Sequence, residues 1–441
     1  MTNASTSDVI VIGGGFSGVA AAAALRAHDL DVTILERNAV LGGRARSDVS
    51  GGWAIDTGAQ LIASTFARTL RLLENASLEP TLGRDVFVRN STRLPIHFGS
   101  IMSMLRFRGL SAVDKVRLGT TLLPLLSRHR DVLRADGNEG LEAFDQHAAR
   151  AFVEKAISER AADVLVEPPL NAFYGTRGRD TSFAFFLTLG RYATDAQLMA
   201  CRDGWSAALA RTVANVRVEF DVRVDALDLD SSDIVVRDST SREWHGRAIV
   251  IATSASAARK LLGSASTSTH PFARWLESIA SRPIWTVALT LTRSGPVDAF
   301  GVLADPAVSE VVSACALPGG RWRASHERDH VVLAWPTPDA VDRLRDRTAT
   351  EIVAAMMPEI ERLVPQVRGS VERARVFRFD EGTPVAAPGF VAHRAIGREL
   401  AASLPLPVAM AGDYLTMPLV EGAVASGELA AERIVSHLTR A

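Results

Sequence analysis

A glycine-rich turn near the start of the chain constrains its fold more than any other feature. The turn follows an apolar run, Val9–Ile12, and precedes a helical pattern over about residues 16–28. Within it, Gly13 permits a tight turn, Gly15 lets the backbone approach a pyrophosphate, and Gly18 lets helix and strand pack closely. The amino-terminal end of such a helix attracts phosphate groups because it carries partial positive charge. A strand, turn and helix in this order are typical of dinucleotide sites.

An acidic residue ends the next apolar run where a dinucleotide site requires one. Val32–Leu35 is predicted to be a second strand, and Glu36 and Arg37 follow it directly. Glu36 lies 18 residues after Gly18, close to the usual spacing for a carboxylate that accepts hydrogen bonds from ribose hydroxyls. These parts predict a dinucleotide-binding unit, but they do not distinguish NAD from FAD.

A second glycine pair, Gly42 and Gly43, is followed by Arg44 and favours FAD. This segment and the later Gly58–Gln60 resemble the second signature of an FAD-dependent superfamily. The superfamily contains flavin amine oxidases, protoporphyrinogen oxidases and phytoene-type desaturases. The resemblance implies that Arg44 lies beside the pyrophosphate and that Gly58–Gln60 passes the flavin.

Three later segments extend this resemblance. It implies that Val224 meets the adenine through its backbone, that Asp413 serves the ribityl-phosphate region, and that the helix starting near Val420 faces the flavin pyrimidine. A helix end there would stabilise negative charge on reduced flavin. The residues expected at FAD are Gly13, Gly15, Phe16, Ser17, Gly18, Glu36, Arg37, Gly43, Arg44, Gly58, Ala59, Gln60, Val224, Gly412, Asp413, Val420 and Ala423. Neither cysteine, Cys201 or Cys315, lies in these segments, so we expect the FAD to be non-covalent.

The cofactor segments are discontinuous, and this predicts the architecture. We expect an α/β protein with a Rossmann-type, glutathione-reductase-like FAD-binding domain made of residues 1–80, 200–265 and 395–441. An inserted α+β substrate-binding domain, part of it helical, would comprise residues 81–199 and 266–394. Helices are predicted at Ala112–Arg134, Gly140–Arg150, Ala151–Val166 (ended by Pro168 and Pro169) and Ala349–Leu363, and strands at Ile284–Thr292, Gly301–Ala304, Val308–Leu317 and Val331–Trp335.

The expected reaction is hydride transfer from a hydrophobic small molecule to flavin N5. In the amine oxidases a lysine lies on the strand under the flavin, but the matching segment here, residues 283–289, has none. Those enzymes also place an aromatic residue where this chain has Leu419. Both differences point away from primary amines. No catalytic acid or base is identified; the groups expected near the isoalloxazine are Asp56, Gln60, Trp205 and Tyr414.

The segment Glu167–Gly175, followed by Ser182, resembles a stretch of the protoporphyrinogen oxidases and desaturases. Its aromatic side chains could line a substrate channel, and we expect Tyr174, Phe183 and Leu419 to lie there. Two alternatives stay open: a flavin amine or amino-acid oxidase with an unusual site, and a non-catalytic flavin-bound accessory protein. Oxygen or a quinone would take the electrons from reduced FAD.

Composition narrows the partners. The net charge of −1 offers no excess of positive charge for binding nucleic acid. The two cysteines are far apart in the sequence, which argues against a zinc site. We expect no metal. The polar start of the chain and the lack of about 18 consecutive apolar residues predict a cytoplasmic protein without a membrane span. Peripheral membrane contact is an additional hypothesis, because Phe98–Leu110 mixes Met, Phe and Leu with Arg106 and Arg108.

Overall fold

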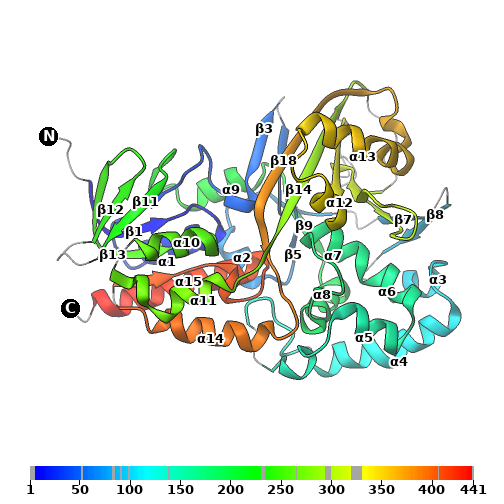
Figure 1. The fold of residues 1–441 in the computed structure, drawn as a ribbon, viewed down its shortest axis with the longest axis horizontal. Helices are drawn as coiled ribbons and strands as arrows, with labels where there is room; N and C mark the ends of the chain where they lie inside the picture. Colours follow the sequence, from blue (N-terminus) through cyan, green and yellow to red (C-terminus); the bar gives the residue numbers. More distant parts are fainter. Residues whose placement is uncertain are drawn as a thin grey trace.

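Two large sheets of seven strands each organise the protein. The computed structural model describes residues 5–50, 53–81, 85–89, 92–97, 100–137, 140–229, 234–264, 266–293, 299–318, 330–405 and 407–439. The first sheet lies on the left of Figure 1 and the second extends from the centre to the upper right, with its long strands β14 (Ser281–Leu291) and β18 (Val371–Pro384) on the side nearest the first sheet. A lower layer of helices, α4 to α8, completes the right half of the molecule.

The first sheet has the order β10–β2–β1–β13–β12–β11, with β19 beside β13. The pairs β10–β2, β2–β1, β1–β13 and β13–β19 are parallel, whereas β11, β12 and β13 pair antiparallel. The strands are β1 (Ser5–Ile12), β2 (Val32–Leu35), β10 (Arg217–Glu219), β11 (Val224–Asp228), β12 (Ile234–Asp238), β13 (Glu243–Ile251) and β19 (Val408–Met410).

Helices cover both faces of this sheet, which explains why β1 is apolar at successive positions. Val9 and Val11 belong to one core cluster with α1 and α15, whereas Ile10 and Ile12 belong to another with α10 and α11. A side chain at Gly427 would meet the Ser17 carbonyl oxygen at 2.2 Å, so this glycine allows α15 to approach α1. The helices are α1 (Phe16–Arg26), α10 (Ala255–Gly263), α11 (Pro271–Glu277), α14 (Phe390–Ala402) and α15 (Val420–Leu438).

The second sheet has the order β18–β14–β17–β16–β15–β7–β8. Val287 and Leu289 of β14 pack towards α13 (Ala349–Leu363), whereas Ala288 between them faces the core that contains the helical layer. The remaining strands are β7 (Asp85–Arg89), β8 (Thr92–Ile96), β15 (Gly301–Ala304), β16 (Val312–Ala316) and β17 (Val331–Pro336). The prediction for residues 349–363 is therefore confirmed.

Two predictions for the helical layer are wrong. Before α5 begins at Ala149, residues 140–148 form only a short 3-10 turn, Glu142–Phe144, because the Asp145 carbonyl oxygen accepts from the Gly389 amide and the His147 carbonyl oxygen from the Phe183 amide. Pro168 and Pro169 do not end a helix. They occupy the first turn of the next helix, α7. Backbone N–H groups in a first turn have no carbonyl partner within the helix, so the missing N–H of proline costs no hydrogen bond there.

The helical layer also contains more and shorter helices than the apolar periodicity of the sequence predicts. A single helix was expected over residues 151–166, but Ser158 caps a second helix by accepting a hydrogen bond from the Ala161 amide. The helices are α3 (Ile101–Arg106), α4 (Ala112–Arg128), α5 (Ala149–Ala156), α6 (Glu159–Leu165), α7 (Glu167–Tyr174) and α8 (Phe183–Asp195). None of the described helices of the protein is both long and apolar enough to cross a membrane.

Short elements connect the two sheets. Strands β3 (Ser47–Ser50) and β4 (Trp53–Asp56) form a hairpin, and β5 (Ile62–Ala63), β9 (Leu198–Cys201) and β6 (Leu78–Pro80) form a small sheet. The remaining helices are α2 (Ala67–Leu72), α9 (Trp205–Thr212) and α12 (Pro338–Arg343).

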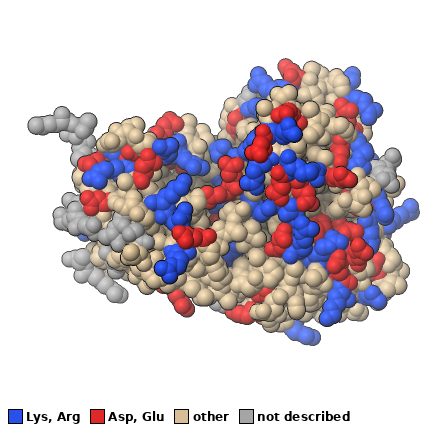
Figure 2. All heavy atoms as spheres, viewed as in Figure 1, with Lys and Arg blue, Asp and Glu red and all other residues tan. Residues whose placement is uncertain are grey.

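On the face shown in Figure 2, basic and acidic side chains are interspersed, and the surface is hollowed between the two halves. The residue boundaries expected for two domains stay a prediction.

Candidate active site

One large cavity runs from the first sheet into the helical layer. Its volume is about 1870 Å³, whereas pockets for a single small ligand measure about 300–1,000 Å³. The cavity begins at the glycine turn after β1, passes Arg44 and Gln60, and ends against α4, where Leu118 and Leu122 line it. It therefore has room for a dinucleotide at one end and a second molecule at the other.

The glycines of the first turn differ in what surrounds them. Gly13 has a positive φ of +105° at the turn, where a side chain would also strike the Ala252 carbonyl oxygen. A side chain on Gly18 would lie 1.8 Å from the Gly13 carbonyl oxygen, so α1 packs directly on the turn. By contrast, a Cβ on Gly15 would meet no atom within 4 Å, although Gly15 lines the cavity. The space beside Gly15 is open for a bulky group such as a pyrophosphate.

Glu36 links the turn to the end of β2. Its Oε2 accepts a hydrogen bond from the Gly14 amide at 2.7 Å, and its Oε1 accepts one from the Asn38 amide at 2.8 Å. The side chain is buried in the protein but borders the cavity. A carboxylate fixed in this way at the end of β2 suits the recognition of ribose hydroxyls.

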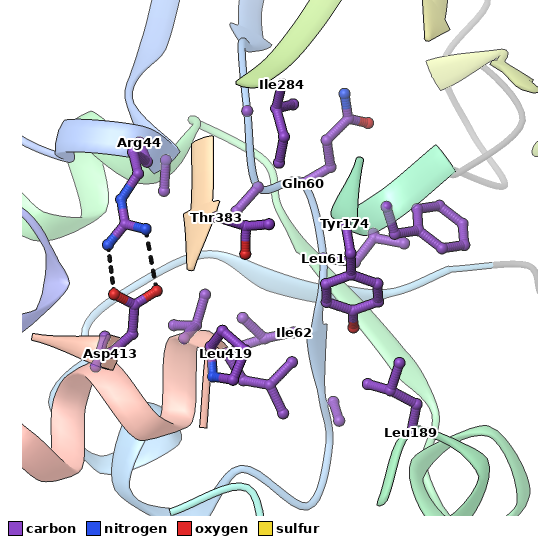
Figure 3. A pocket seen from close by; sticks show the side chains of 18 of the residues that line it. Arg44, Gln60, Leu61, Ile62, Tyr174, Leu189, Ile284, Thr383, Asp413 and Leu419 are labelled. Carbon is purple, nitrogen blue, oxygen red and sulfur yellow. Dashed lines mark hydrogen bonds and ion pairs between the residues drawn. The ribbon is translucent and has the colours of Figure 1, made fainter. Parts of the chain in front are cut away.

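Arg44 and Asp413 form a two-bond ion pair at the middle of the cavity (Figure 3). The distances are 3.0 Å from Nη1 to Oδ2 and 2.7 Å from Nη2 to Oδ1. Burial by itself would lower the pKa of Arg44, but the attraction and hydrogen bonds of Asp413 outweigh it and raise that pKa. Arg44 therefore keeps its full positive charge, which an anionic cofactor requires.

Beyond this pair the cavity becomes apolar. Figure 3 shows Leu61, Ile62 and Leu419 around one space, with Tyr174 pointing into it. Ile284 on β14 also borders the space, and no lysine occurs on that strand. Gln60 also lines the cavity, with its Nε2 donating to the Asp56 carbonyl oxygen at 3.2 Å.

The structure brings most of the predicted site residues to this one cavity. Those that line it are Gly13, Gly15, Phe16, Ser17, Glu36, Arg37, Gly43, Arg44, Gly58, Ala59, Gln60, Val224, Gly412, Asp413, Val420 and Ala423, together with Tyr174 and Leu419. Gly18 lies behind the turn, as a packing glycine should.

Three aromatic predictions do not fit the cavity. Phe183 is fully buried and stacks on Phe152 with ring centroids 3.7 Å apart, so it does not line the expected channel. Trp205 and Tyr414 are each 1% exposed and lie outside the lining: Trp205 packs edge-on against Phe16, and the ring of Tyr414 fills the space beside Gly412.

Asp56 also lies outside the lining. Its Oδ1 accepts a hydrogen bond from Ser47 Oγ at 2.7 Å across the β3–β4 hairpin, which is a structural contact.

Several lining residues were not predicted. Ala252 to Ser254 follow β13, which is parallel to β1, so the carboxyl ends of neighbouring parallel strands were the available signal. At the far end, Leu118, Leu122 and Leu126 of α4 line the cavity. Their spacing indicates a helix face but not whether that face packs on core or borders a space.

The far end also holds charged groups. Burial raises the pKa of the Asp85 carboxyl to about 6, although the Gly301 amide and His97 act in the opposite direction. Lys115 borders the same end and donates from Nζ to the Leu105 carbonyl oxygen at 2.8 Å. Arg130 and Arg191 line it as well, so cations outnumber this carboxylate.

The two cysteines are buried and unpaired, and burial raises the pKa of both thiols. Cys315 borders the apolar end of the cavity and Cys201 does not. Over the described ranges, no group of three or more His, Cys, Asp or Glu side chains could hold a metal ion.

Comparison with known proteins identifies the family. Residues 16–435 match the family described as flavin containing amine oxidoreductase. The chain belongs to this family. It is therefore an FAD-dependent oxidoreductase, and the resemblance inferred from its motifs and the FAD cofactor are confirmed.

Its relatives differ in how much of the chain they match. Coproporphyrinogen III oxidase of Mycobacterium tuberculosis is 26% identical over 451 residues, which cover 92% of each chain. Polyamine oxidase 5 of Oryza sativa subsp. japonica is 47% identical, but over 76 residues that span 16% of this chain and 15% of that relative. The structure of cyclohexylamine oxidase from Brevibacterium oxydans has a TM-score of 0.73 at 19% identity and covers 98% of this chain and 100% of that one. These similarities confirm the predicted fold class.

Proposed function

We propose that the substrate of this oxidoreductase is a large apolar molecule that carries acidic groups, of the porphyrinogen type. The observation that supports this most is the shape and lining of the far half of the cavity. The side chains there are mainly aliphatic or aromatic: Leu118, Leu122, Leu123, Leu126, Phe186, Leu187, Leu189, Phe300, Leu303 and Trp335. Such a lining suits a broad hydrocarbon surface better than a short amine.

The near half of the cavity fits FAD. We propose that the turn at Gly13–Gly15 and the start of α1 hold the pyrophosphate, that Glu36 binds the ribose, and that Val224 meets the adenine. Arg44 would supply the cation for the phosphates. The start of α15 at Val420 would face the flavin, where the helix end stabilises negative charge. When bound, FAD supplies a hydride acceptor at N5.

The side chains of this protein contribute to the reaction by orienting the substrate. Ile284 borders the cavity on β14, the strand that matches the one on which the amine oxidases carry a lysine, and Leu419 precedes α15 where they place an aromatic residue. Neither side chain can hold or move a proton. The apolar residues exclude water and fix the C–H bond of the substrate, and orientation of this kind accounts for much of the rate acceleration in such reactions.

The charges at the far end support acidic groups on the substrate. Among the described residues that line this end are the cations Lys115, Arg130 and Arg191 and the carboxylate of Asp85; Lys115 and Arg191 also donate to backbone carbonyl oxygens. Cations at the end of an apolar chamber can pair with carboxylates at the edge of a flat apolar molecule. The relative that is similar along nearly its whole length is a coproporphyrinogen III oxidase, whereas the polyamine oxidase similarity is local.

Anaerobic stopped-flow spectroscopy tests this proposal. Coproporphyrinogen III is expected to bleach the oxidised-flavin band rapidly, with porphyrin fluorescence appearing in step, because its C–H bonds can lie over the flavin while its carboxylates pair with the cations at the far end. Putrescine and benzylamine are expected to leave the band unchanged. Free FAD mixed with each compound is the control. Reduction by an amine alone would establish the amine-oxidase alternative, and no reduction by any compound of a wide panel would favour the accessory role. Re-oxidation by oxygen or a quinone then identifies the acceptor.

We also propose that the protein touches a membrane through α3 and α4. Met102, Leu105, Val113 and Val116 on these helices are each between 53% and 65% exposed. Leu105 borders the cavity as well, so this surface adjoins the route by which an apolar substrate would enter. Apolar side chains beside basic ones suit the interface of an anionic bilayer.

Co-sedimentation with anionic phosphatidylglycerol vesicles tests this contact. The unmodified protein is expected to pellet with the vesicles, and an Arg106→Ala/Arg108→Ala variant is expected to pellet less, because each basic residue near such a surface contributes about 1 kcal/mol. An Arg217→Ala variant, altered on the opposite half of the molecule, serves as the control. Failure of the unmodified protein to pellet would contradict the proposal.

A further inference from the structure

Tyr174 is fixed at the border between the two halves of the cavity. It is the last residue of α7, and Gly175 after it adopts φ +59°, which ends the helix. A side chain on Gly175 would lie 3.0 Å from the Pro283 carbonyl oxygen and 3.1 Å from Ile284, so the end of α7 lies against β14. Phe185 packs against the tyrosine ring edge-on, with centroids 5.3 Å apart. The ring therefore has a defined direction, into the cavity.

The hydroxyl of this tyrosine has no protein partner among the residues that the structure describes. The chain has three tyrosines. The Tyr192 hydroxyl accepts from the Ala135 amide at 2.7 Å, and the Tyr414 hydroxyl donates to the Ala411 carbonyl oxygen at 3.5 Å. Tyr174 packs against Phe185 and the core, and its hydroxyl forms no hydrogen bond with the described part of the chain.

The surroundings of the Tyr174 hydroxyl are apolar. Figure 3 shows it directed into the space bordered by Leu61, Leu189 and Leu419, none of which can form a hydrogen bond through its side chain. Burial raises the pKa of Tyr174, so its hydroxyl stays neutral and can both donate and accept. The hydroxyl borders the cavity, so its hydrogen-bond partner comes from what fills that cavity: water in the free protein, and the substrate once it is bound.

We propose that Tyr174 orients the substrate. Its hydroxyl would accept a hydrogen bond from a substrate N–H that lies close to the C–H bond that is oxidised. The apolar walls confine the substrate, and a hydrogen bond close to the reacting C–H bond would add a direction to its orientation. The pyrrole N–H of a porphyrinogen and the amino N–H of an amine both meet this description. The reaction class rests on the proposed function, but the hydrogen bond does not depend on which of the two compounds reacts.

The Tyr174→Phe variant tests the proposal because it removes the oxygen and keeps the ring. Its FAD content and thermal midpoint are expected to match those of the unmodified protein. The dissociation constant for coproporphyrinogen III, from the concentration dependence of anaerobic flavin reduction, is expected to rise about three- to tenfold. The shape of the rate profile between pH 6 and 9 should stay the same, because the hydroxyl does not titrate there. If an amine proves to be the reducing substrate, the same comparison is made with that amine.

A second measurement is independent of turnover. Indole and indene have nearly the same shape, but only indole carries an N–H. Perturbation of the bound flavin spectrum is expected to show that the unmodified protein prefers indole about three- to tenfold, that Tyr174→Phe loses this preference, and that Tyr192→Phe keeps it. An unchanged preference in Tyr174→Phe, or unchanged substrate affinity, would overturn the role of Tyr174. Failure of every porphyrinogen and amine to reduce the flavin would instead contradict the proposed function and leave the indole comparison decisive for Tyr174.

Discussion

The Gly15→Val variant is expected to fold normally and to bind no FAD. Gly15 has φ −77° and ψ −178°, an extended conformation that any residue adopts, so valine introduces no backbone strain there. A Cβ at this position has no atom within 4 Å, so the β-carbon of valine causes no clash with the protein. The valine side chain would instead fill the open space at the start of α1, where we place the pyrophosphate.

Two other glycines supply matched controls. Gly18→Val is expected to disrupt the fold, because a Cβ there would lie 1.8 Å from the Gly13 carbonyl oxygen. Gly263→Val, at the exposed end of α10, also meets nothing within 4 Å and is expected to retain FAD. The flavin absorbance after reconstitution measures binding, and circular dichroism with thermal unfolding reports the fold. Stoichiometric FAD in a folded Gly15→Val protein would show that the cofactor lies elsewhere.

The cofactor half of the cavity could be predicted from the sequence because its demands are local. A tight turn requires Gly13, close packing of helix and strand requires Gly18, and the end of β2 carries Glu36. Each demand is met by residues near one another in the chain, so motif and spacing are enough to find them.

The substrate half could not be predicted in the same way. Tyr174 and Phe183 lie nine positions apart in one aromatic segment, but Tyr174 borders the cavity and Phe183 stacks on Phe152 in the core. Periodicity identifies an apolar face without saying whether it meets protein or space. Likewise, α4 has an ordinary amphipathic pattern, and only the tertiary structure shows that Leu118 and Leu122 border the cavity.

Helix boundaries failed where distant residues compete for the backbone. The Asp145 carbonyl oxygen accepts from the Gly389 amide and the His147 carbonyl oxygen from the Phe183 amide, partners that are remote in sequence, and the expected helix around them does not form. The pairing of Arg44 with Asp413 is equally non-local, since 369 positions separate the two residues. The motifs indicated each residue separately but not their direct contact.

Because Arg44 pairs with Asp413, we expect the Arg44→Ala variant to lose much of its affinity for FAD. The Asp413 carboxylate is 9% exposed, so removing Arg44 leaves a buried negative charge without its partner, beside the phosphates we expect. We expect FAD affinity to fall by at least about 2 kcal/mol, or roughly thirtyfold in Kd. Arg44→Lys should recover only part of this loss, because an ammonium cannot form both hydrogen bonds in the planar geometry of a guanidinium. Fluorescence titration of the apoprotein with FAD measures the series.

A double variant separates two causes of weaker FAD binding: the loss of the Arg44 cation, and the repulsion from the Asp413 carboxylate that is left without a partner. If the uncompensated Asp413 charge causes much of the loss, Arg44→Ala/Asp413→Asn should bind FAD more tightly than Arg44→Ala alone, because the repulsion is removed. Arg375→Ala, which breaks a pair with Asp48 away from the cavity, should leave affinity unchanged. Unaltered binding in Arg44→Ala would contradict its role at the cofactor. A double variant weaker than Arg44→Ala would show that Asp413 binds FAD itself, as the motif around Gly412 implies, in addition to holding Arg44.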